Sequence, residues 1–379
     1  MEEGGIYIHI PFCRNKCLYC DFYSGGSRIA DWNKYTKALE EEFNLRQSEM
    51  DFNPVTLYLG GGTPSLIPSG YLNGLVKFLN ERVRNNYWKE FTLELNPEDV
   101  TSDKCRDWKK IGINRISLGL QTLDDNILKN IGRKHISKQG LEALAILGQH
   151  FDNVSVDLMF GLPGQTPEIY EKTISQILKL NPTHISSYSL MLEPGTALTH
   201  LNEKKKIKLP SEHDWLKMFD ITNNKLAENG YHRYEISNYS LNGFESIHNT
   251  NYWLGKPYMG LGPGAHSYDG KSIRKANPKD IKGYLSYFLS STKNIIHFYE
   301  EENLSQNDLC EEMIMTRMRT KKGLDLELFK EKFGDIKKEK LLQQSNKYLQ
   351  SGLLKESSGY LFFTEKGWLI FDTILSDII

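Results

Sequence analysis

The chain alternates short apolar segments with amphipathic helical segments from residue 5 to about residue 192, and this alternation limits its fold more than any other feature. The apolar segments have the length and composition of strands, and they are GIYIHI (5–10), VTLYLG (55–60), FTLELN (91–96), RISLGLQ (115–121), VSVDLMFG (154–161) and HISSYSL (184–190). Helical patterns lie near 31–50, 69–86, 101–111, 137–149 and 167–180, with candidate N-caps at Ser69, Thr101 and Ser137. Strands separated by crossover helices predict a parallel sheet, and therefore an α/β fold.

Unusual residues follow consecutive predicted strands. They are Cys13, Cys17 and Cys20 after the first strand, GGGTP (60–64) after the second, Glu94 and Gln121 at the ends of the third and fourth, and Asp157 within the fifth. In a parallel barrel the carboxyl ends of the strands converge on one mouth, where binding sites are built. A doubly wound sheet also fits the alternation, but it would leave some of these residues far apart. The sequence therefore favours a partial (β/α)6 TIM-like barrel.

The strand–helix rhythm ends after LEPGT (192–196). A lysine-rich loop, a helical stretch over 211–229 and a glycine-rich segment, GLGPGAHSY (260–268), follow it. From about residue 300 the pattern is helical, and it ends in a helix–strand–turn–strand order typical of a winged helix. We expect three parts: a barrel over 1–195, an extension of the barrel over 196–295, and a C-terminal helical, winged-helix-like domain over 296–379.

The charge balance and the hydropathy pattern exclude several classes of function. With 47 Lys and Arg against 48 Asp and Glu, the chain has no bulk electrostatic attraction for nucleic acid, so we assign the winged-helix pattern to packing or partner docking rather than to DNA binding. No apolar run approaches the roughly 20 residues of a membrane span. The opening MEEGG has the pattern of neither a signal nor a transit peptide. We therefore expect a cytoplasmic protein.

Five cysteines form an odd set, and three of them are clustered. In a reducing compartment, clustered thiols indicate metal or redox chemistry rather than disulfides. Cys105 and Cys310 stand alone in helical patterns, and we expect them to be buried hydrophobic residues. Cys13, Cys17 and Cys20 can hold a [4Fe–4S] cluster with one open iron, or a zinc ion with His9 as the nearest further ligand.

The C-x₃-C-x₂-C spacing at the mouth of a parallel barrel resembles the radical S-adenosylmethionine (SAM) superfamily. The resemblance implies that SAM chelates the open iron of a [4Fe–4S] cluster. The reduced cluster would then pass an electron to the sulfonium, and the C–S bond would break to give methionine and a 5′-deoxyadenosyl radical. Seven segments from residue 5 onward further resemble the family of oxygen-independent coproporphyrinogen III dehydrogenase and its haem-chaperone relatives: YIHIPFCRNKCLYCDFYS, YLGGGTPSL, LELNPE, RISLGLQTLDD…LKNIGRKH, VDLMFGLPGQT, SSYSLMLEPGT and HNTNYWLGKPYMGLGPGAHSY. The resemblance extends through the C-terminal module.

The strand-end residues then gain candidate roles toward SAM. The glycines of GGGTP allow the backbone to approach a ligand, and the Thr63 hydroxyl can donate a hydrogen bond. Glu94 is either a solvated strand end or an acceptor for a ribose hydroxyl or an ammonium group, and Tyr19 either stacks near adenine or shields the cluster. By motif, the resemblance implies SAM contacts at Tyr7, Gly61, Gly62, Thr63, Glu94, Gln121, Arg133, Asp157 and Met191. The dehydrogenase binds two SAM molecules, and the sequence leaves their number here open.

Two features separate the haem chaperones from the dehydrogenase. The dehydrogenase resemblance calls for a further cysteine two positions after Cys20, where this chain has Phe22, and for a long N-terminal extension. HNTNYW (248–253) matches the H-N-x-x-Y-W element that the resemblance associates with haem binding. His248 would be an axial ligand, and Tyr252 and Trp253 would form an apolar wall. The alternative is a hydrogen-bonded structural histidine, and His266 is a second ligand candidate.

The leading hypothesis is a cytoplasmic haem chaperone that binds haem, carries a [4Fe–4S] cluster with exchangeable SAM, and transfers haem to an apo-acceptor such as a respiratory haem protein. The alternative is oxidative decarboxylation of coproporphyrinogen III to protoporphyrinogen IX by radical SAM chemistry. A haem- or iron-sensing DNA reader is a third hypothesis, which the balanced charge disfavours. Peripheral membrane association and a homodimer are compatible with the sequence, although no segment requires either. We assign no catalytic residue.

Overall fold

A computed structural model describes residues 1–26, 30–83, 87–291 and 298–379. The six predicted strands all form, and they lie side by side and parallel in the middle of a 12-stranded sheet. They are β1 (Glu3–Ile10), β4 (Asn53–Gly61), β5 (Glu90–Leu95), β6 (Arg115–Gln121), β7 (Val154–Phe160) and β8 (His184–Ser189). The α/β prediction and the partial barrel are confirmed.

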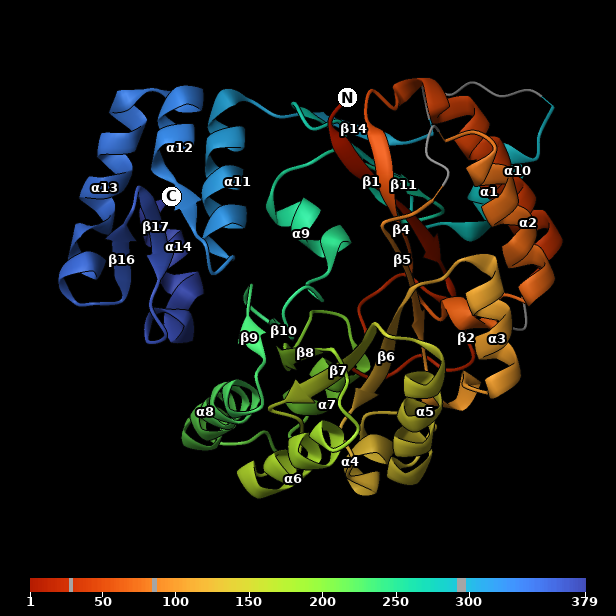
Figure 1. Ribbon diagram of the computed structural model, residues 1–379, viewed down its shortest axis with the longest axis horizontal. Coiled ribbons are helices and arrows are strands. Elements are labelled where there is room, and N and C mark those ends of the chain that lie inside the picture. Colours follow the sequence, from red (N-terminus) through yellow and green to blue (C-terminus); the bar gives the residue numbers. More distant parts are fainter. Residues whose placement is uncertain (27–29, 84–86, 292–297) are drawn as a thin grey trace.

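Helices cover the outer face of these parallel strands (Figure 1). They are α1 (Trp32–Arg46), α2 (Ser69–Asn80), α3 (Ser102–Ile111), α4 (Asp125–Asn130), α5 (Ser137–His150) and α6 (Pro167–Leu178). Thr101 caps α3 as predicted, and its hydroxyl accepts from the Lys104 N–H at 3.3 Å. Ser69 and Ser137 are instead the first helical residues, because the chain turns into the helix one residue earlier. The last part of the predicted helix over 69–86, residues 84–86, lies outside the described residues.

Side chains along each parallel strand alternate between the face of the sheet that the helices cover and the interior of the barrel. The side chains on the helix-covered face form the hydrophobic core, and Ile8, Leu59 and Leu93 among them are at most 1% exposed. The intervening positions, such as Tyr58 and Glu94, point to the other side of the sheet, into the barrel. Each fully buried aliphatic side chain contributes about 1.5–3 kcal/mol, so the register of these strands is strongly fixed. Cys105 is also in this core, as expected.

The sheet continues beyond the six parallel strands on both sides. Next to β1 lie β11 (Tyr258–Leu261), which is parallel to it, and the antiparallel β12 (His266–Tyr268), β13 (Ile273–Ala276) and β14 (Glu300–Asn303). Next to β8 lie β10 (Asn238–Ser240) and β9 (His232–Arg233). These strands were not predicted, because sequences such as IRKA and EEEN carry no alternating apolar pattern. They form by pairing with edges that the barrel already provides.

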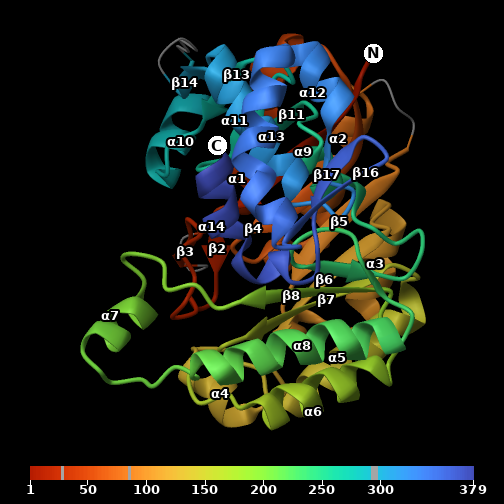
Figure 2. The same ribbon diagram turned by 90° about the vertical axis from the view of Figure 1, so that its left-hand side faces the viewer.

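The connections around these edge strands include four helices. The helices are α7 (Ala197–Glu203), α8 (Glu212–Glu228), α9 (Ile247–Trp253) and α10 (Ile281–Phe288). The helical stretch predicted over 211–229 is α8, with Ser211 as its N-cap, and the HNTNYW segment lies in α9. Figure 2 shows α7 projecting from the body of the molecule. The two-residue strands β2 (Phe12–Cys13) and β3 (Gly25–Gly26) pair beside the cysteine loop.

The C-terminal region has a hydrophobic core of its own, between Cys310 and Ile378. Its elements are α11 (Gln306–Met318), β15 (Leu324–Asp325), α12 (Leu326–Phe333), α13 (Asp335–Gln350), β16 (Leu354–Ser357), β17 (Tyr360–Phe363) and α14 (Phe371–Ile378). Its strands form a three-stranded antiparallel sheet in the order β15–β17–β16, which together with the helices gives a winged-helix-like arrangement. Cys310 is buried, as expected. The divisions at 195/196 and 295/296 stay predictions, and residues 292–297 lie outside the described part of the chain.

The C-terminal region packs against the extension of the barrel, near α9 and the edge strands (Figures 1 and 2). Arg317 of α11 donates to the backbone oxygen of Leu254 at 2.8 Å, and Arg274 of β13 pairs with Glu312 at 2.5 Å. In the described ranges, no helix has both the length and the apolar character needed to cross a lipid bilayer.

Candidate functional site

The three clustered cysteines open onto a cavity of about 470 Å³ at the carboxyl ends of the barrel strands, called the cysteine cavity below. Nine of the residues that the resemblance or the sequence assigned to SAM line it together with the thiols: Tyr19, Gly61, Gly62, Thr63, Glu94, Gln121, Arg133, Asp157 and Met191. Consecutive parallel strands therefore bring these residues to one place, although they span more than 170 positions of sequence.

The backbone around Cys13 fits closely against the second strand end. The Thr63 hydroxyl donates to the Cys13 Sγ at 3.6 Å, and Gly62 approaches so closely that a Cβ there would lie 3.0 Å from this sulfur. Gly61 has φ +107°, and a Cβ on it would lie 2.5 Å from the His9 ring. Both glycines are thus required by space, and Gly61 also by backbone conformation.

Burial raises the pKa of the Cys13 thiol and raises that of Cys20 to about 11. Positive charge from bound iron is what would stabilise such thiols as thiolates. Within the described residues, no three His, Cys, Asp or Glu side chains converge as the ligands of a single metal ion do. His9, the candidate fourth zinc ligand, has both ring nitrogens engaged, with the Tyr7 hydroxyl at 3.1 Å and the Tyr23 backbone oxygen at 2.8 Å. The donor set fits a cluster with an open iron better than zinc.

Two half-buried carboxyl groups lie deeper in the barrel. Glu94 accepts hydrogen bonds from the Tyr58 hydroxyl at 2.7 Å and from the Gly61 N–H at 3.1 Å. Asp157 accepts from the Ser117 hydroxyl at 3.0 Å. Burial raises the pKa of Glu94 to about 7 and that of Asp157 to about 6. A cationic or hydroxyl-bearing ligand in the cysteine cavity would favour their ionised forms.

Arg133 and Gln121 also line the cysteine cavity. Arg133 donates to Asn96 Oδ1 at 2.8 Å and to the Cys17 Sγ at 3.7 Å, while its buried Nε has no partner among the described residues. Gln121 has φ 68° at an irregularity in the β6–β7 ladder, a conformation that costs of order 1–3 kcal/mol and is concentrated at functional sites. Asn96, which the sequence reasoning missed, also donates to the Thr63 hydroxyl at 3.3 Å. Its position two residues after Glu94 was the available signal.

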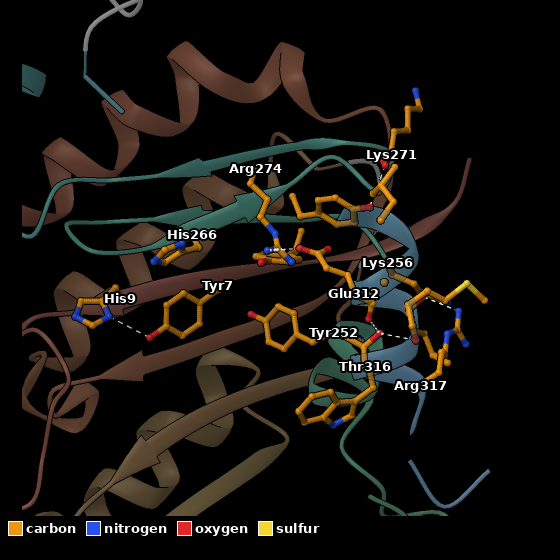
Figure 3. A pocket seen from close by; sticks show the side chains of 18 of the residues that line it. Tyr7, His9, Tyr252, Lys256, His266, Lys271, Arg274, Glu312, Thr316 and Arg317 are labelled. Carbon is orange, nitrogen blue, oxygen red and sulfur yellow. Dashed lines mark hydrogen bonds and ion pairs between the residues drawn. The ribbon is translucent and has the colours of Figure 1, made fainter. Parts of the chain in front are cut away.

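Tyr7 lies elsewhere, in a second cavity of about 670 Å³ between the edge strands and the C-terminal region (Figure 3). We call it the aromatic cavity. Tyr252 and Trp253 of the HNTNYW element line it, with Tyr258, His266 and Tyr268. The tyrosines pack in series, with ring centroids 4.6 Å apart for Tyr252 and Tyr258 and 6.4 Å apart for Tyr258 and Tyr268. Asp21 and Phe22 line both cavities, so the segment after Cys20 forms a shared wall.

His248 is placed behind this cavity rather than on its surface. It is 2% exposed, its Nδ1 lies 2.7 Å from the Thr56 hydroxyl, and its Nε2 lies 2.9 Å from the Tyr252 hydroxyl. Burial and the nearby Arg115 cation lower the pKa of His248 to about 3, so the ring is neutral. Within the part of the chain that the structure describes, His248 is not among the residues lining the aromatic cavity.

The helix that carries His248 is held by a carboxylate far away in sequence. Glu90 accepts from the N–H groups of Ile247 at 2.7 Å and His248 at 3.2 Å, and from the Ser246 hydroxyl at 3.0 Å. These are groups at the first turn of α9, where a negative charge is favourable. Sequence reasoning missed Glu90, because 156 residues separate it from Ser246.

The comparisons with known proteins agree with this architecture. The model of the radical SAM superfamily matches residues 7–177, and that of the HemN C-terminal domain matches residues 304–370. The structure of the radical SAM enzyme coproporphyrinogen III oxidase (HemN) from Escherichia coli superposes with a TM-score of 0.84, covering 100% of this chain and 90% of that chain at 22% identity. The fold is therefore that of a radical SAM protein with a HemN-type C-terminal domain.

The relatives found by sequence show to which family of radical SAM proteins the chain belongs. The chain is 34% identical to the protein named heme chaperone HemW of Bacillus subtilis, over 96% of each chain. It is also 34% identical to the heme chaperone HemW of Lactococcus lactis, over 97% of this chain and 95% of the relative. The chain belongs to the HemW family, and the resemblance seen in its sequence is confirmed.

Proposed function

We propose that the protein is a haem chaperone that carries a [4Fe–4S] cluster and SAM in the cysteine cavity and haem in the aromatic cavity. The observation that carries this proposal is the pair of cavities sharing the wall Asp21–Phe22. One cavity offers three thiols and buried polar groups, and the other offers tyrosine and tryptophan rings with basic side chains. Relatives over nearly the whole length are named heme chaperones.

Cys13, Cys17 and Cys20 would hold the cluster, and the cluster would supply an open iron that the amino and carboxylate groups of SAM can chelate. Gly61 and Gly62 line the cavity beside the thiols, and the Thr63 hydroxyl already faces the Cys13 sulfur. The half-buried Glu94 and Asp157 carboxyls can accept hydrogen bonds from ribose hydroxyls or neutralise a cation. Tyr19, Gln121, Arg133 and Met191 complete the cavity wall.

The aromatic cavity suits a flat, largely apolar macrocycle with two carboxylates. Its volume of about 670 Å³ falls within the roughly 300–1,000 Å³ of enclosed ligand sites. Six basic side chains line it, against the carboxylates of Asp21 and Glu312: Lys256, Lys271, Arg274, Lys279, Arg317 and Lys332. The haem propionates would find complementary charge there, and an apo-haem-protein would be the acceptor.

The sequence at Phe22 does not meet one requirement of the alternative, a coproporphyrinogen dehydrogenase. The dehydrogenase resemblance places a fourth cysteine at this position, whereas the Phe22 side chain here is 59% exposed and faces both cavities. Transfer of haem to a partner needs a cavity that opens to solvent, and the aromatic cavity is open in this way. Free thiols at Cys13, Cys17 and Cys20 suit a reducing compartment such as the cytoplasm.

The test is anaerobic reconstitution followed by titration with hemin on the same sample. The proposal expects about four iron and four sulfide per chain, a saturable Soret band from bound haem, and transfer of that haem to an apo-haem-protein. An assay with coproporphyrinogen III, SAM and a reductant should give no protoporphyrinogen. Absence of saturable haem binding, or turnover of coproporphyrinogen III, would reject the proposal.

A further inference from the structure

Three histidines lie in or next to the aromatic cavity, and they differ in whether a ring nitrogen is free. His9 and His248 are 4% and 2% exposed, and each has both ring nitrogens within hydrogen-bond distance of a partner. His266 lines the cavity with an exposed side chain, and no hydrogen bond from its ring to any of the described residues is present. An axial ligand to iron needs a neutral imidazole nitrogen with a free lone pair.

The strand register places small residues on both sides of His266, so that the surface of the sheet beside its ring is flat. Tyr7 on β1 lies opposite Gly260 on β11, and Gly260 packs against His266 on β12 so closely that a Cβ would lie 2.0 Å from the His266 backbone oxygen. On the far side His266 lies opposite the small Ala276. Between the rings of Tyr7 and His266 there is therefore no intervening side chain, and Figure 3 shows both rings on the same side of the sheet.

Aromatic and basic side chains lie next to His266 on the same face of the sheet, on the adjacent strands β11, β12 and β13. Tyr258 pairs with Tyr268, which pairs in turn with Arg274. Side chains two residues apart on a strand share a face, so Tyr268 stands on the same face as His266. Arg274 contacts Glu312 at 2.5 Å, and its guanidinium keeps further donors for a carboxylate.

We propose that His266, rather than His248, is the axial ligand of haem, with the macrocycle against the tyrosine rings and the propionates toward Arg274 and Lys279. This inference rests on the proposed function and names the ligand within the same site. Partial desolvation, Lys279 and Arg274 lower the pKa of His266, which favours the neutral imidazole that coordination requires. Both cations line the same cavity as His266, where they can pair with the propionates of a haem ligated there.

His248 then has a positioning role. Its Nε2 holds the hydroxyl of Tyr252, which is part of the cavity wall, and its Nδ1 is tied to Thr56 on the adjacent strand β4. To reach iron, the ring would have to break both hydrogen bonds and leave its buried position. Removal of His248 should therefore loosen the wall and weaken haem binding without removing the ligand.

The test compares His266→Ala, His248→Ala and the exposed control His213→Ala in hemin titrations of the full chain, with absorption and electron paramagnetic resonance of the ferric complex. His266→Ala should lose the histidine-ligated spectrum and bind about tenfold or more weakly. His248→Ala should also bind more weakly, but its bound haem should keep the wild-type spectrum. In His266→Gly, added imidazole should restore that spectrum.

Three results separate the claims. If His266→Ala binds haem with wild-type spectrum and affinity, the ligand assignment is wrong and the proposed function stands. The same holds if only His248→Ala loses the histidine-ligated spectrum, or if imidazole fails to rescue a folded His266→Gly. If the wild-type protein shows no saturable binding, the proposed function falls, and the inference falls with it.

Discussion

The cysteine cavity and the aromatic cavity are built by the chain in two different ways. The first is made from the carboxyl ends of consecutive parallel strands, between Cys13 and Glu193. The second is made from one face of β1, from edge strands near residue 260 and from the C-terminal α11 and α12. The first is a property of the barrel alone, whereas the second exists only after distant segments have packed together.

This difference implies that the two cavities should respond independently to mutation, except at their shared wall. The Cys13 thiol is held against Gly62 and Thr63, at the end of the neighbouring barrel strand. The aromatic cavity depends on long-range ties such as Glu90 to α9 and Arg317 to Leu254. Three predictions test this separation.

The largest expected effect is that of Cys17→Ser. Loss of one of three thiolate ligands should reduce iron and sulfide after reconstitution to near background. The haem affinity should stay within about twofold of wild type, since well-separated sites contribute nearly additively. Metal analysis and a hemin titration on the same preparation check this. Cys105→Ser is not a suitable control, because Cys105 is in the hydrophobic core. Joint loss of cluster and haem would show that the cavities are one site.

Glu90→Gln should weaken haem binding and leave cluster uptake unchanged, which is the reverse of the result expected for Cys17→Ser. Glu90 is 3% exposed, and its carboxylate lies 4.0 Å from the buried Arg115 guanidinium and caps α9. Removing one partner of a buried charge pair costs about 3–5 kcal/mol. Urea unfolding should show this loss, and haem binding should weaken because α9 carries Tyr252.

The matched control is Asp31→Asn, since asparagine also caps helices well and Asp31 accepts from the Lys34 N–H in an exposed position. It should change the free energy of unfolding little. Glu90→Gln should still take up a cluster at a temperature where it is folded. Loss of the cluster with retention of haem would contradict the separation.

The smallest effect concerns pH and the cysteine cavity before reconstitution. Burial raises the pKa of Glu94 from 4.5 to about 7, so between these values the folded state binds more protons than the unfolded chain. The Glu94 contribution to stability is therefore present at low pH and decreases as pH rises to 7, by up to about 1.4 kcal/mol per pH unit.

The Glu94→Gln variant should lack this contribution, so the difference between its stability and that of wild type should change with pH over this window. The exposed Glu81→Gln should reproduce the wild-type profile. Urea unfolding at several pH values between 4.5 and 8 measures the difference. A pH-independent difference for Glu94→Gln would show that the carboxyl is not held in the buried, protonated form.

The sequence predicted the barrel because each of its strands carries its own signal. Segments such as 55–60 and 154–161 are apolar, and they are bounded by turns and helices. Once these strands are parallel and adjacent, Glu94, Gln121 and Asp157 must converge on one mouth. The cysteine cavity followed from local patterns and one topological rule.

The aromatic cavity could not be predicted in this way. The glycine-rich segment 260–268 reads as a loop, and its strands form only by pairing with the edge of β1. Tyr7 was assigned to the SAM set by motif, and in the structure it lines the aromatic cavity. The burial of His248 depends on Thr56 and Glu90, which are more than 150 residues away in sequence.

The central claim is that cluster and haem occupy separate cavities of one chain at the same time. Hemin titration of the reconstituted protein under anaerobic conditions tests it directly, with the Soret band and the electron paramagnetic resonance signal of the reduced cluster followed together. The account predicts one haem bound per chain while the cluster signal and SAM binding persist. Loss of the cluster signal in proportion to haem bound would contradict it.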